Sequence, residues 1–195
     1  MNKNILLCGV GGQGTVLASR LIALAAMEKG MQAMGAETIG MAQRGGSVVS
    51  HVRTGENIHS PLIPYKKADV IIGFEPAEAV RCLPYLKESG CVIVCPKAIQ
   101  PVTSSLMGGS YKGEEMLEYL KKNVKKLVVV NGDEICEKCG SPKVLNVALL
   151  GAAVSSGETG ISLEEMESAI TKRVPEKFKQ MNITALRLGA QEAEK

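Results

Sequence analysis

The stretch GVGGQGT, Gly9–Thr15, stands between a short apolar run and a long apolar segment. From Gly9 it has the spacing G-x-G-x-x-G, which is typical of a loop that leads from a β-strand into an α-helix. Glycines at these positions allow a tight turn and a close approach of the backbone to a ligand. The first turn of the following helix offers N–H groups to an anion. The stretch therefore predicts a strand–loop–helix unit whose loop suits an anion.

Strand and helix patterns alternate along the 195 residues. Nearly continuous apolar strands are typical of a parallel sheet that is covered on both faces. We therefore predict an α/β fold with a Rossmann-like, mainly parallel sheet, helices on both faces and a helical C-terminal tail from about residue 142. A single domain spanning residues 1–195 is expected. Strands are predicted at 4–9, 31–37, 47–53, 69–74, 91–95 and 127–130, and helices at 14–29, 75–87, 114–123, 144–155, from 162 and from 182.

Composition excludes several classes of function. A net charge of +3 is too small to favour nucleic-acid binding, and 3% aromatic residues without Trp provide no stacking platform for bases. No segment approaches the ~20 apolar residues that span a bilayer. The apolar run before Cys8 has three residues, fewer than the ~7–15 of a signal peptide. We therefore expect a cytoplasmic protein without a membrane or nucleic-acid partner.

The cysteines and histidines do not form a recognisable catalytic or metal-binding pattern. Cys136 and Cys139 are the one pair with metal-ligand spacing, but a zinc site needs a second pair. Structural thiols are therefore expected, with metal binding and redox use as alternatives. His51 and His59 have no carboxylate or cysteine pattern around them, and His51 is expected to be structural. No catalytic residue and no metal ligand is predicted.

The glycine spacing also raises the possibility of NAD(P) binding. Glu37 lies about where a dinucleotide fold places the acidic residue that binds the ribose. Two features argue against this interpretation. Gly12 and Gln13 add a glycine and an amide to the loop, and the loop that follows Glu37 leads directly into another strand instead of a crossover helix. NAD(P) binding stays open as the alternative.

The helix predicted after the glycine loop is apolar on nearly all sides. Between residues 16 and 27 only Ser19 and Arg20 are polar. Such a helix is buried on more than one side. Either the C-terminal helices of the same chain or a partner chain is expected to cover the side that does not face the sheet.

A second loop, Gly40–Val48 (GMAQRGGSV), precedes the third predicted strand. Its Arg44 carries a planar guanidinium that suits a phosphate or a carboxylate. Together with the first loop, KADVIIGFE at 67–75 and KVLNVALLG at 143–151, it carries a resemblance over essentially the whole chain. The sequence resembles the gamma domain of 2-oxoacid:ferredoxin oxidoreductases, and particularly the beta subunit of indolepyruvate ferredoxin oxidoreductases.

The resemblance implies an accessory subunit of an oxidoreductase, not a self-sufficient enzyme. In this family a 2-oxo acid, here an aryl pyruvate, is decarboxylated on thiamine diphosphate, and electrons pass through [4Fe-4S] clusters to ferredoxin. The acyl group ends on coenzyme A, while thiamine diphosphate, Mg²⁺ and the clusters belong to a larger alpha subunit in a hetero-oligomer. A non-enzymatic module that binds coenzyme A or a nucleotide is a further alternative.

The same resemblance assigns the site residues. The first loop is expected to supply Gly9, Gly11, Gly12, Gln13, Gly14 and Thr15. The second loop is expected to face the partner subunit or the coenzyme A passage with Gln43, Arg44, Gly45, Gly46 and Ser47.

Overall fold

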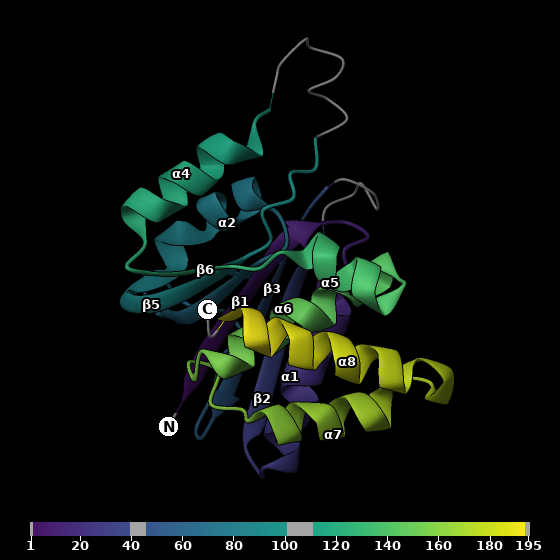
Figure 1. Cartoon of the computed structure of the whole chain (residues 1–195). Helices are drawn as coiled ribbons and strands as arrows, with labels where there is room; N and C mark the ends of the chain where they lie inside the picture. Colours follow the sequence, from purple (N-terminus) through teal and green to yellow (C-terminus); the bar gives the residue numbers. More distant parts are fainter. Residues whose placement is uncertain (1, 40–45, 101–110, 194–195) are drawn as a thin grey trace.

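A six-stranded sheet lies between two layers of helices (Figure 1). The computed structural model describes residues 2–39, 46–100 and 111–193, and within them the predicted α/β architecture is confirmed. The strand order is β2-β3-β1-β4-β5-β6. The strands are β1 Lys3–Val10, β2 Gln32–Ile39, β3 Ser47–Gly55, β4 Ala68–Gly73, β5 Leu86–Val94 and β6 Lys126–Val129.

The sheet is parallel on one side and antiparallel on the other. β1, β4, β5 and β6 pair in parallel, whereas β3 runs antiparallel between β1 and β2. The short connection after β2 explains the reversal, because a parallel pair would need a longer crossover. The antiparallel pairing of β2 with β3 fits the prediction that the chain after Glu37 leads directly into another strand.

One face of the sheet carries the larger hydrophobic core. Alternate residues of the strands, such as Ile5, Leu7 and Ile72, are fully buried against this layer. The C-terminal helices also cover the side of α1 that faces away from the sheet, which was one of the two expected alternatives. Met27 of α1 nevertheless stays 58% exposed. The helices are α1 Thr15–Glu28, α5 Gly132–Cys139, α6 Leu145–Ser155, α7 Leu163–Arg173 and α8 Glu176–Ala193.

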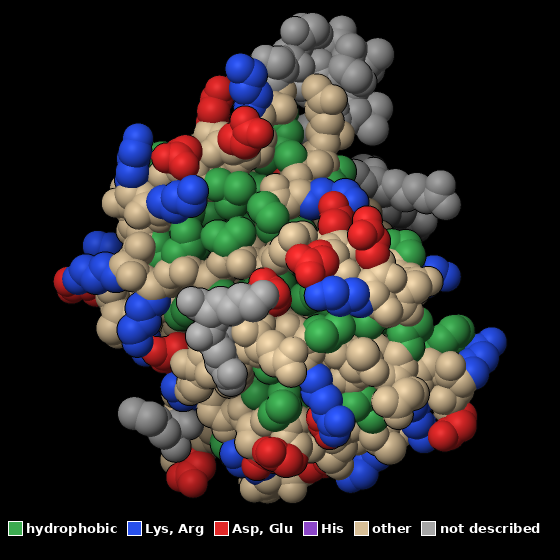
Figure 2. Space-filling model, in the orientation of Figure 1, with side chains coloured by type: hydrophobic (Ala, Val, Ile, Leu, Met, Phe, Trp, Pro, Cys, Tyr) green, Lys and Arg blue, Asp and Glu red, His purple; other side chains and the backbone are tan. Residues whose placement is uncertain are grey.

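The opposite face is covered by two helices, α2 Pro76–Cys82 and α4 Gly113–Asn123. The intervening strand residues, including Leu6, Ile71 and Val92, pack there in a second core. On the side shown in Figure 2, hydrophobic side chains gather between α4 and β6 and charged side chains surround them. This thinner layer leaves Val129 of β6 39% exposed.

Two glycines allow α6 and α8 to touch backbone to backbone. A Cβ added to Gly151 would lie 1.9 Å from the carbonyl oxygen of Leu186, and one added to Gly189 would lie 1.9 Å from that of Ala148. This contact explains why the KVLNVALLG segment ends in glycine. Neither these helices nor any other helix in the described ranges combines the length and apolar character that a membrane crossing requires.

Several predicted element ends were wrong. The helix predicted to reach residue 87 ends at Cys82, and a 3-10 turn, Leu83–Tyr85, leads into β5. Pro84 explains the early end, because a proline inside a helix removes a hydrogen bond and clashes with the preceding turn. The last helix begins at Glu176, directly after Pro175, and not at residue 182. The helix predicted from residue 162 is α7, and Ser162 and Glu165 form a capping box at its start.

Candidate functional site

The candidate site lies at the carboxyl edge of the parallel strands, where the chain leaves neighbouring strands toward opposite faces. β1 continues into α1 on one face, and β4 continues into α2 on the other. In open α/β sheets this divergence creates a crevice that commonly binds ligands or partners. The glycine loop, Gly9–Thr15, lies at the end of β1, and the Phe74–Glu75 connection lies beside it at the end of β4.

The glycines of the loop are needed because neighbouring atoms leave no room for a side chain. A Cβ added to Gly9 would lie 2.7 Å from Oε1 of Gln13 and 2.8 Å from Cβ of Phe74. Gly14 precedes α1 with a φ of 81°, a left-handed conformation that favours glycine. A Cβ added there would lie 2.8 Å from Nδ2 of Asn146. Both glycines therefore serve the packing of the loop.

Gln13 links the glycine loop to the end of β4. Its side-chain Oε1 accepts a hydrogen bond from the backbone N–H of Val10 at 2.8 Å. Its Nε2 donates to the carbonyl oxygen of Phe74 at 2.8 Å. The amide therefore joins the ends of β1 and β4, a role that its position in the loop had not revealed.

The second loop meets the first at the same edge. The backbone N–H of Gly11 donates to the carbonyl oxygen of Gly46 at 2.8 Å. The hydroxyl of Ser47 donates to Oε2 of Glu78 at 2.6 Å. The structure thus places Gly46 and Ser47 against the glycine loop and α2, while Gln43, Arg44 and Gly45 lie outside the described residues.

A buried carboxylate at the start of α2 was missed by sequence reasoning. Glu75 is 2% exposed and caps α2, because its Oε2 accepts hydrogen bonds from the N–H groups of Ala77 at 2.8 Å and Glu78 at 3.1 Å. The hydroxyl of Tyr111 donates to its Oε1, and burial together with this bond raises the pKa of Tyr111. Glu75 therefore joins the end of β4 to a residue far along the chain.

The local sequence indicates part of this arrangement. Glu75 before Pro76 is the pattern of a helix cap with proline in the first turn. Glu78, one turn later, also forms an ion pair with Arg81. Nothing in the sequence indicated that Tyr111 would reach Glu75, because their contact spans 36 positions.

The geometry argues against dinucleotide binding at this loop. β3 separates β1 from β2, so Glu37 does not lie on the strand next to the glycine loop as a ribose-binding acid would. Its carboxylate accepts a hydrogen bond from Ser19 at 3.2 Å instead. The N–H of Gly11 is likewise engaged by Gly46.

The remaining chemical candidates have structural roles in the described residues. His51 is 5% exposed, its Nδ1 accepts a hydrogen bond from the N–H of Ile63 at 3.2 Å, and burial lowers its pKa. Cys136 and Cys139 lie on the last turn of α5, and burial raises the pKa of Cys136 to about 11. No group of three potential metal ligands is found in the described ranges.

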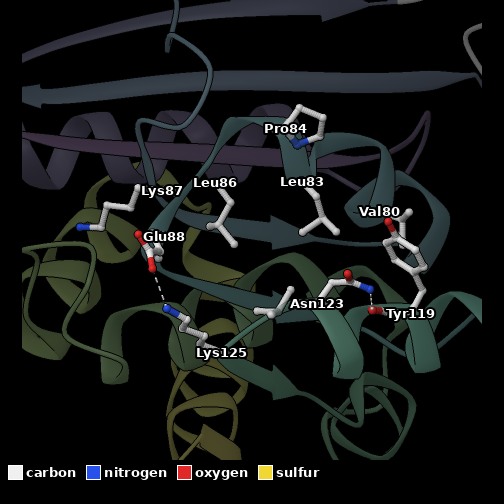
Figure 3. A pocket seen from close by; sticks show the side chains of 11 residues that line it. Val80, Leu83, Pro84, Leu86, Lys87, Glu88, Tyr119, Asn123 and Lys125 are labelled. Atoms are coloured by element: carbon white, nitrogen blue, oxygen red, sulfur yellow. Dashed lines mark hydrogen bonds and ion pairs between the residues drawn. The ribbon is translucent and has the colours of Figure 1, made fainter.

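A pocket of about 460 Å³ lies at the other end of the sheet, between α2, β5 and α4 (Figure 3). Its apolar lining includes Leu83, Leu86 and Tyr119, which is 49% exposed. At its rim, Lys125 and Glu88 form an ion pair at 2.9 Å. The described lining residues include no cysteine, serine, threonine or histidine, and the pocket lies away from the glycine loop.

Comparisons with known proteins fit this architecture. The family model described as pyruvate ferredoxin/flavodoxin oxidoreductase matches residues 4–192. The chain is 39% identical over 194 residues to the indolepyruvate oxidoreductase subunit IorB of Archaeoglobus fulgidus, covering 99% of this chain and 96% of the relative. It is 31% identical to the common gamma subunit of the pyruvate/ketoisovalerate oxidoreductases of Pyrococcus abyssi, covering 92% and 90% of the two chains.

A solved structure has the same fold over the full length. The gamma subunit of a keto/oxoacid ferredoxin oxidoreductase from Geobacter sulfurreducens superposes with a TM-score of 0.73 at 25% identity, covering 100% of this chain and 97% of the other. The similarity covers the whole chain, including the glycine loop and the C-terminal helices. The chain belongs to the pyruvate ferredoxin/flavodoxin oxidoreductase family.

Proposed function

We propose that this chain is the accessory subunit of an indolepyruvate:ferredoxin oxidoreductase. The complex would convert an aryl 2-oxo acid and coenzyme A into an acyl-CoA and CO₂, and the electrons released would reduce ferredoxin. The observation that carries the proposal is the likeness to the indolepyruvate oxidoreductase subunit over 99% of the chain. The likeness to the pyruvate/ketoisovalerate subunit is lower, at 31% identity.

The thiamine diphosphate, Mg²⁺ and iron–sulfur clusters of such a complex belong to a larger partner subunit in this proposal. The cysteines of this chain do not fit a cluster site, because Cys8, Cys91 and Cys95 are buried in or next to strands and Cys136 lies on a helix. An iron–sulfur cluster needs cysteines that converge on one centre. The chain therefore contributes binding surface and not the redox centres.

The carboxyl edge of the sheet would form the junction with the partner subunit or line the passage for coenzyme A. Gly9, Gly11, Gly12, Gln13, Gly14 and Thr15 would form one half of this junction, and Gln43, Arg44, Gly45, Gly46 and Ser47 the other. The bond between Gly11 and Gly46 supports this assignment, because it brings both loops to one surface. The 195 residues would act as a single domain in the cytoplasm.

Purification of the native protein from its own cells tests the proposal. We expect a brown complex with a larger subunit that contains iron and thiamine diphosphate and reduces ferredoxin with indolepyruvate. A colourless protein that NADH stabilises against unfolding would instead support a dehydrogenase. A colourless protein without a partner, stabilised by coenzyme A alone, would indicate a binding module.

Replacement of Arg44 tests the second loop directly. In the reconstituted complex, Arg44→Ala should weaken subunit binding or raise the KM for coenzyme A by about tenfold or more, because a charge-assisted hydrogen bond contributes about 1.5–3 kcal/mol. Arg173→Ala, on the last turn of α7, is the matched control and should change neither quantity. Unchanged binding and unchanged KM for Arg44→Ala would reject a role for this guanidinium.

A further inference from the structure

The two edges of the sheet differ in how well they are protected. β2 is the outermost strand on one side and has eight residues, whereas β6 on the other side has four. β6 also begins with Lys126, which is held by Glu158 at 2.8 Å. Short strands and lysines are devices that keep a sheet edge from pairing with another chain.

β2 lacks these devices. Its sequence, QAMGAETI, contains neither lysine nor proline, and its only charged residue is Glu37. An unprotected edge of this length offers a row of backbone N–H and C=O groups to a further strand. The side chains at its centre are small, because Ala33, Gly35 and Ala36 leave the backbone accessible.

The helix beside this edge has an exposed side of its own. Arg20, Ala23 and Met27 follow one another on one side of α1 at helical spacing. A pocket of about 320 Å³ places Arg20 and Ala23 next to Gly35 and Glu37 of β2. The edge strand and this side of α1 therefore form one continuous surface.

The charges of this surface are not neutralised within the described part of the chain. Arg20 and Glu37 are both exposed, and neither forms an ion pair with another described residue. Among the described residues, the carboxylate of Glu37 accepts a hydrogen bond from the hydroxyl of Ser19 alone. The surface thus presents one positive and one negative group side by side.

From these observations we infer that the β2 edge binds a second copy of this chain. The two β2 strands run antiparallel across a twofold axis and join their sheets, while the exposed sides of the two α1 helices pack together. A twofold axis presents the same surface to itself, so one cation and one anion per copy are self-complementary. Arg20 of each copy faces Glu37 of the other. This interface is independent of the substrate and of the junction proposed at the carboxyl edge.

Charge exchange tests the interface in the full-length chain. Sedimentation velocity over a concentration series should show a dimer of twice 20.7 kDa. Arg20→Glu and Glu37→Lys should each raise the dimer dissociation constant at least ~10-fold, because each places like charges opposite one another. The double variant, which restores opposite charges, should return it to within ~3-fold of the original value. Lys122→Glu, on the exposed side of α4, makes the same charge change as Arg20→Glu and should have no effect.

Amide hydrogen exchange locates the contact. Exchange at residues 32–39 should slow as the protein concentration rises, because the outer N–H groups of β2 become hydrogen-bonded in the dimer. A chain that stays monomeric at all concentrations would overturn the inference. A dimer with concentration-independent exchange at 32–39, or single variants that dimerise normally, would overturn it as well.

Discussion

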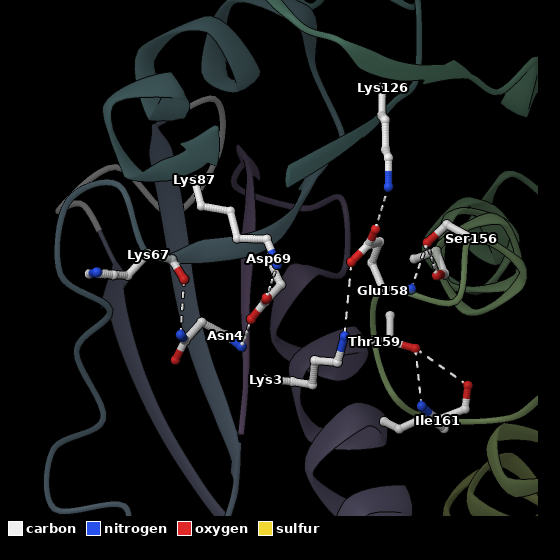
Figure 4. Close-up of polar contacts among 11 residues, drawn as sticks. Lys3, Asn4, Lys67, Asp69, Lys87, Lys126, Ser156, Glu158, Thr159 and Ile161 are labelled. Carbon is white, nitrogen blue, oxygen red and sulfur yellow. Dashed lines mark hydrogen bonds and ion pairs between the residues drawn. The ribbon is translucent and has the colours of Figure 1, made fainter. Parts of the chain in front are cut away.

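Charged side chains pair with one another at the amino end of the sheet, whereas at the carboxyl end a buried carboxylate is held by backbone N–H groups and a tyrosine hydroxyl. At the amino end, Asp69 binds the ammonium of Lys87, and Glu158 lies between Lys3 at 3.9 Å and Lys126 at 2.8 Å (Figure 4). At the carboxyl end, Glu75 accepts hydrogen bonds from the backbone N–H groups of Ala77, Glu78 and Ile99 and from the hydroxyl of Tyr111.

The difference follows from the segments that meet at each end of the sheet. At the amino end, the starts of the strands lie against the loop between α6 and α7, and ion pairs within the chain hold these segments together. The carboxyl end carries two glycine-rich loops, and no side chain among the described residues caps α1. Backbone donors at such a helix start stay available to a partner or an anion. Ion pairs within the chain hold the amino end together, whereas at the carboxyl end the hydrogen bonds of Glu75 fix the start of α2 below the two loops.

The largest expected loss of stability is at the carboxyl end, where Glu75→Ala removes the carboxylate that caps α2. The variant leaves the buried N–H groups of the α2 start and the Tyr111 hydroxyl without an acceptor. We expect the free energy of unfolding to fall by about 3 kcal/mol, from the lost cap and the unsatisfied donors together. Urea denaturation measures this change.

Two milder variants keep this prediction falsifiable. Glu75→Gln retains an acceptor oxygen and should lose less than the alanine variant, and Tyr111→Phe should lose about 1 kcal/mol. If Glu75→Ala destabilised no more than Tyr111→Phe, the carboxylate would not be the anchor of this end.

A smaller effect is expected at the amino end for Asp69→Ala. Asp69 is 8% exposed, and its Oδ2 accepts the backbone N–H of Asn4 at 2.7 Å while its other oxygen binds Lys87. The unfolding free energy should fall by about 2 kcal/mol, because one backbone donor and one ammonium lose their partner. Asp69→Asn keeps an acceptor for Asn4 and should recover part of the loss. Equal losses for both variants would show that the ion pair alone matters.

Strand positions could be predicted from the sequence because burial on both faces requires continuous apolar runs. The runs at 69–74 and 91–95 fall almost wholly within β4 and β5. The ends of elements depend on single residues such as Pro84, which ends α2 at Cys82. Local sequence rules could have supplied that correction.

The arrangement of the site could not be predicted in the same way. Gly46 reaches Gly11 because β3 pairs with β1 so that Val10 faces Ser47, and this register depends on contacts between distant segments. The position of β3 between β1 and β2 also separates Glu37 from the glycine loop. Sequence reasoning identified both loops, whereas their contact and the Glu75–Tyr111 bond required the folded chain.

The smallest predicted effect, at Glu158, depends on pH. Its hydrogen bond with Lys126 lowers the pKa of Glu158 from its usual value of 4.5. A lowered pKa in the folded state adds stability above the unfolded pKa, and this stability is lost as the pH falls through the folded pKa. Glu158→Gln should therefore cost about 1 kcal/mol at neutral pH and nothing in acid.

Urea denaturation at a series of pH values measures this difference between Glu158→Gln and the unaltered chain. Glu88→Gln is the matched control: Lys125 also lowers the pKa of Glu88, but water screens this exposed pair, so its removal should change the stability much less. A difference that stayed constant through the acid range would mean that the Glu158 side chain acts by packing. If ion pairs stabilise the amino end, the difference in unfolding free energy between Glu158→Gln and the unaltered chain disappears as Glu158 becomes protonated. The loss of stability in Glu75→Ala at the carboxyl end is expected at neutral pH.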